Sequence, residues 1–191
     1  MAERRAAVFL DRDGVINENN PSYVRGWDAF HFIPGSIEAV RRLSHAGLLI
    51  VVVTNQAGIG RGVLPAEVLD DIHSRMCEQI AAAGGEIARV SFCPHRPEDS
   101  CGCRKPLPGM LNEAAEDLMI DLARSFMVGD HFTDIEAGRA AGCTSILVRT
   151  GHGADALQVA GDDHRDELVI VEDLAHATDF ILREAARISA N

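Results

Sequence analysis

The stretch that decides the fold is AAVFLDRDGVIN, residues 6–17. Its first five residues are apolar, and a short apolar run bounded by a glycine turn predicts a buried strand. Asp11 and Asp13 follow at the carboxyl end of that strand, where two carboxylates can converge on one hard cation. Asp11 is also free to attack an electrophile, because carboxylate nucleophiles that become aspartyl-phosphates are an established class. Taken alone, the same stretch is also compatible with a loop that carries two solvated acids.

The bulk properties narrow the class of protein. The chain has 191 residues, 47% hydrophobic and 25% charged, which is typical of one globular domain. Its net charge of −11 argues against a nucleic-acid or anionic-membrane surface, since phosphate backbones require patches of lysine and arginine. The apolar runs are shorter than the ~18 residues of a membrane span, and the first is too short for a signal-peptide core. We therefore expect a cytoplasmic monomer that binds neither nucleic acid nor membrane but can bind a small phosphorylated ligand.

Apolar runs alternate with segments of helical periodicity along the chain. Strands are predicted at 6–10, 48–53, 87–92, 125–128, 145–148 and 168–171. Helices are predicted over about 36–47, 65–84, 108–118, 133–141 and 174–188. Strands separated by helices imply a parallel sheet with right-handed crossovers and helices on both faces. We predict a single doubly wound, Rossmann-like α/β domain over residues 1–191.

In such sheets ligands bind at the carboxyl ends of the strands, so the residues after each strand are candidates for a site. After the second, third and fourth strands these are Thr54, Asn55 and Gln56; Arg104 and Lys105 at the end of a cysteine-rich loop; and Gly129, Asp130 and His131, with Asp134 one helical turn later. Acids, a hydroxyl and cations at one edge are the groups that phosphoryl transfer requires.

The cysteine-rich loop predicts a second metal site. Its candidate ligands are Cys93, His95, Cys101 and Cys103. Three cysteines and one histidine at this spacing are typical of a closed, tetrahedral structural zinc site. Such an ion would pin the loop over about 93–105 and place Arg104 and Lys105 at the phosphate site. The alternative is a loop of free thiols with an incidental histidine.

With these motifs the chain resembles the haloacid dehalogenase (HAD) superfamily of phosphohydrolases. The resemblance rests on DRDG at 11–14, Thr54, Lys105 and GDHFTD at 129–134. It implies that Asp11 forms an aspartyl-phosphate and that Asp13 protonates the leaving alcohol and then activates water.

The resemblance also implies the ligands of the phosphate and of a catalytic Mg²⁺. Thr54 and Lys105 would hold the phosphoryl oxygens, while Asp11, the backbone carbonyl of Asp13 and Asp130 would bind the ion. Asp134 would then brace the loop or the waters of the metal. The remaining histidines have no ligand spacing and are expected to be surface or cap residues: His31, His45, His73, His152, His164 and His176.

The zinc loop narrows the resemblance to the D,D-heptose 1,7-bisphosphate phosphatases, a subfamily akin to the histidinol phosphatases. That subfamily removes the C7 phosphate during nucleotide-activated heptose synthesis and lacks a large cap domain. Specificity is then expected from three loops, with the Arg104 guanidinium gripping the remote C1 phosphate. The residues expected to bind substrate are Asn19, Tyr23, Asn55, Gln56, Arg61, Arg104 and His131. Alternatives are a phosphatase for histidinol phosphate or another small phosphomonoester, a non-catalytic phosphate-binding module, and a zinc hydrolase.

Overall fold

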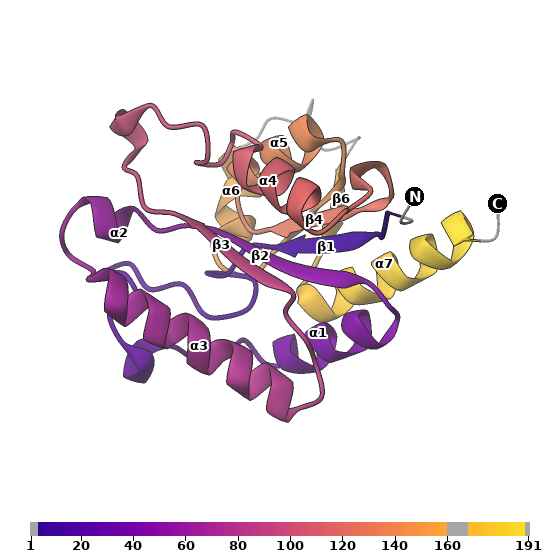
Figure 1. The fold of residues 1–191 in the computed structure, drawn as a ribbon, viewed down its shortest axis with the longest axis horizontal. Coiled ribbons are helices and arrows are strands. Elements are labelled where there is room, and N and C mark those ends of the chain that lie inside the picture. The colour runs from indigo at the N-terminus through magenta and orange to yellow at the C-terminus, as the bar shows by residue number, and fades with distance from the viewer. Residues whose placement is uncertain (1–3, 160–167, 190–191) are drawn as a thin grey trace.

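A computed structural model describes residues 4–159 and 168–189 of the chain, and His164 lies outside these ranges. The six strands form one parallel sheet in the order β3-β2-β1-β4-β5-β6 (Figure 1). Their bounds are β1 (Ala7–Leu10), β2 (Leu49–Asn55), β3 (Arg89–Cys93), β4 (Phe126–Gly129), β5 (Thr144–Val148) and β6 (Val169–Val171). The prediction of a doubly wound α/β sheet is confirmed.

Helices cover both faces of this sheet, with α1, α3 and α7 on one face and α4, α5 and α6 on the other (Figure 1). Their bounds are α1 (Ser36–His45), α2 (Ala57–Gly60), α3 (Ala66–Ala82), α4 (Gly109–Asp117), α5 (Phe132–Ala141), α6 (Gly153–Val159) and α7 (Leu174–Ser189). Short 3-10 turns lie at Trp27–Ala29, Pro97–Asp99 and Leu122–Arg124. Helices α2 and α6 were not predicted, because segments of four and seven residues are too short to display helical periodicity. Throughout the described part of the chain, every helix is too short or too polar to serve as a membrane span.

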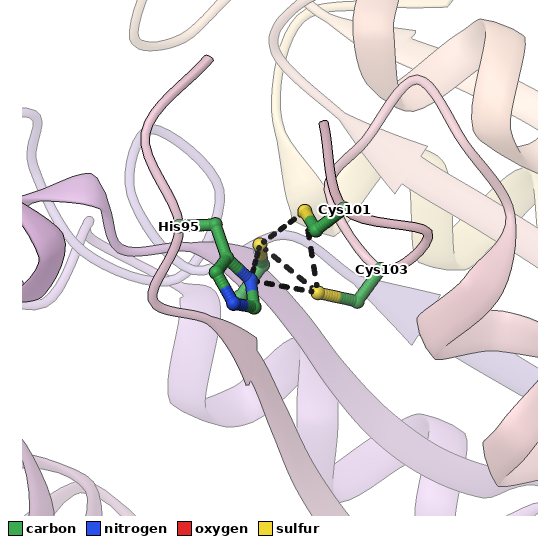
Figure 2. Close-up of side chains that lie close together, drawn as sticks. His95, Cys101 and Cys103 are labelled. Atoms are coloured by element: carbon green, nitrogen blue, oxygen red, sulfur yellow. Dashed lines mark hydrogen bonds between the residues drawn. The ribbon is translucent and has the colours of Figure 1, made fainter. Parts of the chain in front are cut away.

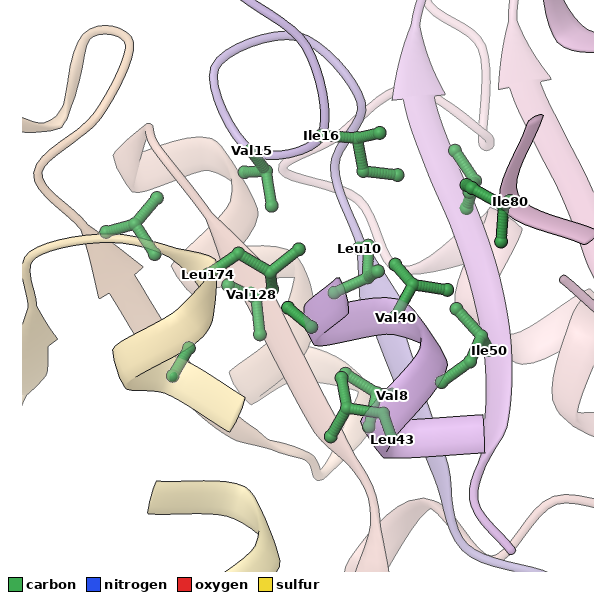
Figure 3. Packing of buried hydrophobic residues seen from close by; sticks show 14 of the residues in the cluster. Val8, Leu10, Val15, Ile16, Val40, Leu43, Ile50, Ile80, Val128 and Leu174 are labelled. Atoms are coloured by element: carbon green, nitrogen blue, oxygen red, sulfur yellow. The ribbon is translucent and has the colours of Figure 1, made fainter. Parts of the chain in front are cut away.

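Strand β1 is apolar at every position because it is buried on both faces of the sheet. Val8 and Leu10 pack into the cluster beneath α1, α3 and α7, which Figure 3 shows from close by. Ala7 and Phe9 pack into the opposite cluster with α4 and α5. Successive side chains of a strand point to opposite faces, so a strand covered on both sides must be apolar at every position.

The strand order places the candidate site. The chain runs outward from β1 to β3 on one side and from β4 to β6 on the other, so the direction of winding reverses between β1 and β4. Strand β1 pairs with both β2 and β4. A crevice opens beyond the carboxyl ends of the strands at such a reversal, and there an open α/β sheet binds its ligands.

Candidate active site and metal centres

Three carboxylates gather at this reversal. Asp11 follows β1, Asp130 follows β4, and Asp134 lies in the first turn of α5; one oxygen from each lies within 4.8 Å of the others. Burial, together with the neighbouring acids, raises the pKa of Asp11 to about 8, although Lys105 opposes the shift. Burial likewise raises the pKa of Asp130. An excess of negative charge on oxygen donors fits a hard divalent cation, so this cluster is a candidate Mg²⁺ site.

The carboxylate of Asp130 is held in place from two loops. The Asn19 side-chain amide and the backbone N–H of His152 each donate to its Oδ2 atom at 2.8 Å. Gly14 and Gly151 lie against the same oxygen, and a Cβ atom at either position would stand 2.0 or 2.1 Å from it. Two hydrogen-bond donors and the close approach of two glycines therefore fix the Oδ2 atom of Asp130, which is a candidate metal ligand.

Lys105 supplies the cation of the site. Its side chain is 2% exposed, and its Nζ atom lies 2.7 Å from the Val53 carbonyl, 3.0 Å from Asp11 and 2.7 Å from Asp134. Burial lowers the pKa of Lys105, but the two carboxylates outweigh burial and raise it above its ordinary value. The ammonium therefore keeps its charge beside the proposed nucleophile.

The residues after β2 build the neighbouring wall. The Asn55 amide pairs with the backbone N–H and C=O of Lys105 at 3.1 Å each. The Gln56 side chain donates to Thr54 Oγ1 at 3.0 Å and to Asp13 Oδ2 at 2.8 Å. Because the Thr54 oxygen accepts this bond, its hydroxyl proton remains free to donate.

Asp13 accepts hydrogen bonds from three side chains. The Arg12 guanidinium spans both of its oxygens at 2.8 and 2.9 Å, and Asn17 and Gln56 add one bond each. Burial by itself raises the pKa of Asp13, but Arg12 and these hydrogen bonds hold it below its ordinary value. Its side chain nevertheless keeps 24% of its surface exposed, so it can reach a bound ligand.

The four predicted zinc ligands converge at the end of β3. Their sulfur and Nδ1 atoms all lie within 4.8 Å of one another, and Figure 2 shows the His95 ring facing the sulfurs of Cys101 and Cys103. The three sulfur–sulfur distances are 3.2, 3.6 and 3.6 Å, and His95 Nδ1 lies 3.3 Å from the Cys103 sulfur. A tetrahedron with zinc–sulfur bonds of about 2.3 Å has edges of about 3.8 Å. The donor set and its spacing therefore fit a closed zinc site.

A pocket of about 550 Å³ lies between this metal loop and the start of α5. Arg104 faces it and donates from Nη1 to the His95 carbonyl at 3.2 Å. On the opposite wall, His131 Nδ1 accepts from the backbone N–H of Thr133 at 3.2 Å. The pocket is lined by Asn55, Arg96, Pro97, Ser100, Cys101, Arg104, Lys105, Pro106, Leu107, His131 and Thr133. Lys105 lines this pocket and also contacts Asp11 and Asp134, so it connects the pocket to the carboxylate site.

Comparison with known proteins gives the family. A family model described as HAD-hydrolase-like matches residues 102–177. The D-glycero-β-D-manno-heptose-1,7-bisphosphate 7-phosphatase of Pseudomonas aeruginosa is 43% identical over 94% of this chain and 99% of that protein. The protein of the same name from Bordetella bronchiseptica is 39% identical over 93% of this chain and 98% of that one. This chain belongs to the heptose bisphosphate phosphatase family.

Solved structures of the heptose bisphosphate phosphatases have the same fold. The D,D-heptose 1,7-bisphosphate phosphatase of B. bronchiseptica, solved with magnesium and phosphate, is 38% identical and superposes with a TM-score of 0.88, covering 94% of this chain and 99% of that one. The enzyme from Burkholderia thailandensis is also 38% identical, with a TM-score of 0.70 over 93% and 99% of the two chains. The predicted resemblance is thus confirmed at the level of sequence and of fold.

The structure gives several predicted substrate residues a partner within the protein. Asn19 holds Asp130, Asn55 holds the backbone of Lys105, and Gln56 holds Asp13, so their contact with substrate stays a prediction. Tyr23 has a left-handed backbone with φ of 66°, and its ring packs against Gly58. Arg61 is exposed just after α2.

Sequence reasoning missed three residues of this site and misplaced a fourth. Arg12 and Asn17 support Asp13, and the backbone of His152 supports Asp130. His73, expected at the surface, is buried beneath the site with 7% exposure, so that expectation was wrong. A signal was present, because Leu69, Ile72, His73, Met76 and Ile80 share the buried face of α3.

The arrangement suits nucleophilic displacement at phosphorus. The Asp11 side chain keeps 13% of its surface exposed and lies beside the buried Lys105 ammonium. Such a reaction needs a carboxylate nucleophile, a cation for the phosphoryl oxygens and a second carboxylate for proton transfer, and this crevice contains groups of each kind.

Proposed function

We propose that this chain is a Mg²⁺-dependent phosphatase that hydrolyses the C7 phosphate ester of D-glycero-D-manno-heptose 1,7-bisphosphate. The observation that carries the proposal is near-full-length identity of 43% to a phosphatase of that name, with every motif of the predicted site present at the strand ends. The names of the relatives specify the β anomer, so we propose the same preference here.

In the proposed reaction, Asp11 attacks phosphorus and the bond from phosphorus to the C7 oxygen breaks. Asp13 must enter this step protonated, against the lowering of its pKa by Arg12 in the free chain. It gives that proton to the C7 oxygen, so the sugar leaves as an alcohol and Asp11 carries an aspartyl-phosphate. Asp13 then takes a proton from a water molecule that attacks the same phosphorus, which frees inorganic phosphate and restores Asp11. Thr54 and Lys105 donate to the phosphoryl oxygens throughout.

We further propose that Asp11, the backbone carbonyl of Asp13 and Asp130 hold the Mg²⁺ ion, which would offset charge on the phosphoryl group. Asp134 remains with Lys105 and the His131 backbone rather than on the ion, since both of its oxygens already accept bonds from these groups. Cys93, His95, Cys101 and Cys103 would hold a structural Zn²⁺ ion that fixes the loop leading to Arg104 and Lys105.

A substrate panel tests the proposal. Release of inorganic phosphate is measured for both anomers of heptose 1,7-bisphosphate, for heptose 7-phosphate and for histidinol phosphate, with zinc retained and Mg²⁺ added or withheld. We expect the highest kcat/KM with the bisphosphate, heptose 1-phosphate as the product by ³¹P NMR, and dependence on Mg²⁺.

Other outcomes identify the alternatives. Higher kcat/KM with histidinol phosphate would replace the proposed substrate, and full activity without Mg²⁺ would favour a zinc hydrolase. A protein that binds phosphate esters but hydrolyses none with either metal would be a binding module. Asp11→Asn serves as the inactive control.

A further inference from the structure

Arg12 is a buried cation between the two catalytic aspartates. It is 1% exposed, and its guanidinium carbon lies 5.9 Å from the centre of the Phe30 ring. A charged group taken out of water is costly unless it is paired and hydrogen-bonded. The hydrogen-bond partners of Arg12 should therefore indicate what role its buried charge has.

The guanidinium joins Asp13 to a histidine on a different element. Its Nη2 atom donates to both oxygens of Asp13, and its Nη1 atom lies 3.2 Å from Nε2 of His73 in α3. The remaining Nε atom is buried without a partner. Asp13 is thus connected through Arg12 to a helix that contributes no group to the crevice among the described contacts.

His73 must accept the proton of this contact. An arginine always donates, so the Nε2 atom can only be the acceptor and the ring must be neutral, with its proton on Nδ1. The surroundings support that state, since burial and the Arg12 cation lower the pKa of His73 to about 3. The His73 ring also packs near the Phe92 ring, with 5.9 Å between the two ring centres.

We propose that Arg12 and His73 are positioning residues for Asp13: the His73 imidazole fixes the Arg12 guanidinium, which holds the Asp13 carboxylate toward the leaving oxygen. Neither residue touches the substrate. This inference rests on the proposed function, in which Asp13 protonates the sugar oxygen. Arg12 Nη2 contacts both oxygens of Asp13, whereas Asn17 and Gln56 each contact one, so Arg12 is the group that centres the carboxylate.

The test compares two leaving groups. Transfer of a phosphoryl group from a primary alcohol needs proton donation by Asp13, whereas p-nitrophenolate leaves without a proton. Because kcat/KM covers only the steps through the transfer to Asp11, it isolates the donating role of Asp13. A defect in positioning should therefore depress kcat/KM for the sugar phosphate alone.

Two substitutions of His73 separate the acceptor from its volume. His73→Phe keeps a ring but removes the acceptor, and we expect kcat/KM for heptose 1,7-bisphosphate to fall about tenfold while that for p-nitrophenyl phosphate changes less than about twofold. His73→Gln restores an acceptor oxygen, and the sugar phosphate value should recover to within about threefold of the wild type. Arg12→Lys keeps the charge but has a single nitrogen, which cannot contact Asp13 and His73 as the two guanidinium nitrogens do, and it should show the same selectivity as His73→Phe. The exposed His31→Phe is the matched control.

The other possible results contradict either the positioning role of His73 or the proposed substrate. Unchanged selectivity in His73→Phe, equal losses on both esters, or equal effects of the Phe and Gln variants would leave His73 a packing residue and refute the inference. If the wild type hydrolyses p-nitrophenyl phosphate and glycerol 3-phosphate but no heptose ester, the proposed substrate is wrong. The comparison of leaving groups can then still be made, with glycerol 3-phosphate in place of the sugar phosphate. Inactivity towards every ester would refute both.

Discussion

The side-chain amide of Asn55 holds the backbone of Lys105 on both sides, with Nδ2 donating to the Lys105 carbonyl and Oδ1 accepting from its N–H, each at 3.1 Å. Asn55 is the last residue of β2, and Lys105 is the second residue after Cys103, at the end of the metal loop. The amide therefore ties the end of that loop to the sheet. The position of the Lys105 ammonium therefore depends on this tie as well as on the loop itself.

Replacement of Asn55 by alanine should weaken both stability and catalysis. Two hydrogen bonds are lost and the Lys105 backbone groups are left without them, so the free energy of unfolding should fall by about 1–3 kcal/mol. The value of kcat should fall because Lys105 is no longer fixed beside Asp11. Urea denaturation and steady-state kinetics measure the two effects, with the exposed Asn112→Ala as control. Unchanged values for Asn55→Ala would show that the metal loop alone holds Lys105.

Loss of one ligand should release the metal loop. Cys101→Ser is expected to bind less than one zinc ion per chain by atomic emission and to unfold about 5–10 °C lower, since each kcal/mol lost lowers the midpoint of a domain of this size by about 2–4 °C. Activity should fall with it, because the loop carries Lys105. Cys77→Ser, on α3 and outside the cluster, should keep its zinc. Full zinc content in Cys101→Ser would exclude that cysteine as a ligand.

Gly151 should be required for the Mg²⁺ site. A Cβ atom there would stand 2.1 Å from Asp130 Oδ2 and 2.6 Å from the Gly14 backbone, so Gly151→Ala must move this carboxylate or the loop beside it. We expect the concentration of Mg²⁺ needed for half-maximal activity to rise at least about tenfold. Gly47 also has a positive φ of 82° but open space around it, so Gly47→Ala shares the backbone strain without the clash. Equal effects of the two variants on the Mg²⁺ requirement would contradict the prediction.

Much of this fold could be predicted because its strands are short, apolar and flanked by glycine, proline or polar residues. The third strand was predicted at 87–92 and lies at Arg89–Cys93, since the alternating residues near its start do not mark where pairing with β2 begins. The ligand residues could be predicted for the same reason as the strands. Each of them directly follows a strand or lies within a single loop.

What the sequence did not predict depends on side-chain contacts between distant segments. Arg12 stands between two recognised acids, yet nothing in its type distinguishes a buried fork from a solvated cation. The part of His152 that matters is its backbone N–H, which carries no sequence signal. Asn19 and Asn55 were predicted to contact the substrate, which stays a prediction, and each also holds a protein group that the sequence did not indicate.

Stability without added Mg²⁺ should decrease as the pH rises. The pKa of Asp11 is about 8 in the folded chain against 3.8 for the ordinary group, so between these values the folded state binds more protons than the unfolded state. Stability then falls with increasing pH across that window. Urea midpoints at pH 6, 7 and 8, with zinc retained, should decline for the wild type and decline less for Asp11→Asn. Added Mg²⁺ should raise the wild-type midpoint at pH 8, and parallel slopes for the two proteins would argue against a raised pKa at Asp11.

Arg104 should distinguish a bisphosphate from a monophosphate. Its guanidinium lines the pocket beyond Lys105 and has no acidic partner among the described ion pairs, so it is available to a second phosphate. We expect Arg104→Ala to lower kcat/KM for heptose 1,7-bisphosphate at least about 30-fold, and that for heptose 7-phosphate less than about threefold, because loss of a charge-assisted fork affects only the ester that carries the C1 phosphate. Arg96→Ala is the matched control, since Arg96 lines the same pocket but is neutralised by Asp99. Equal losses on both substrates would mean that Arg104 supports the loop through the His95 carbonyl and does not read the second phosphate.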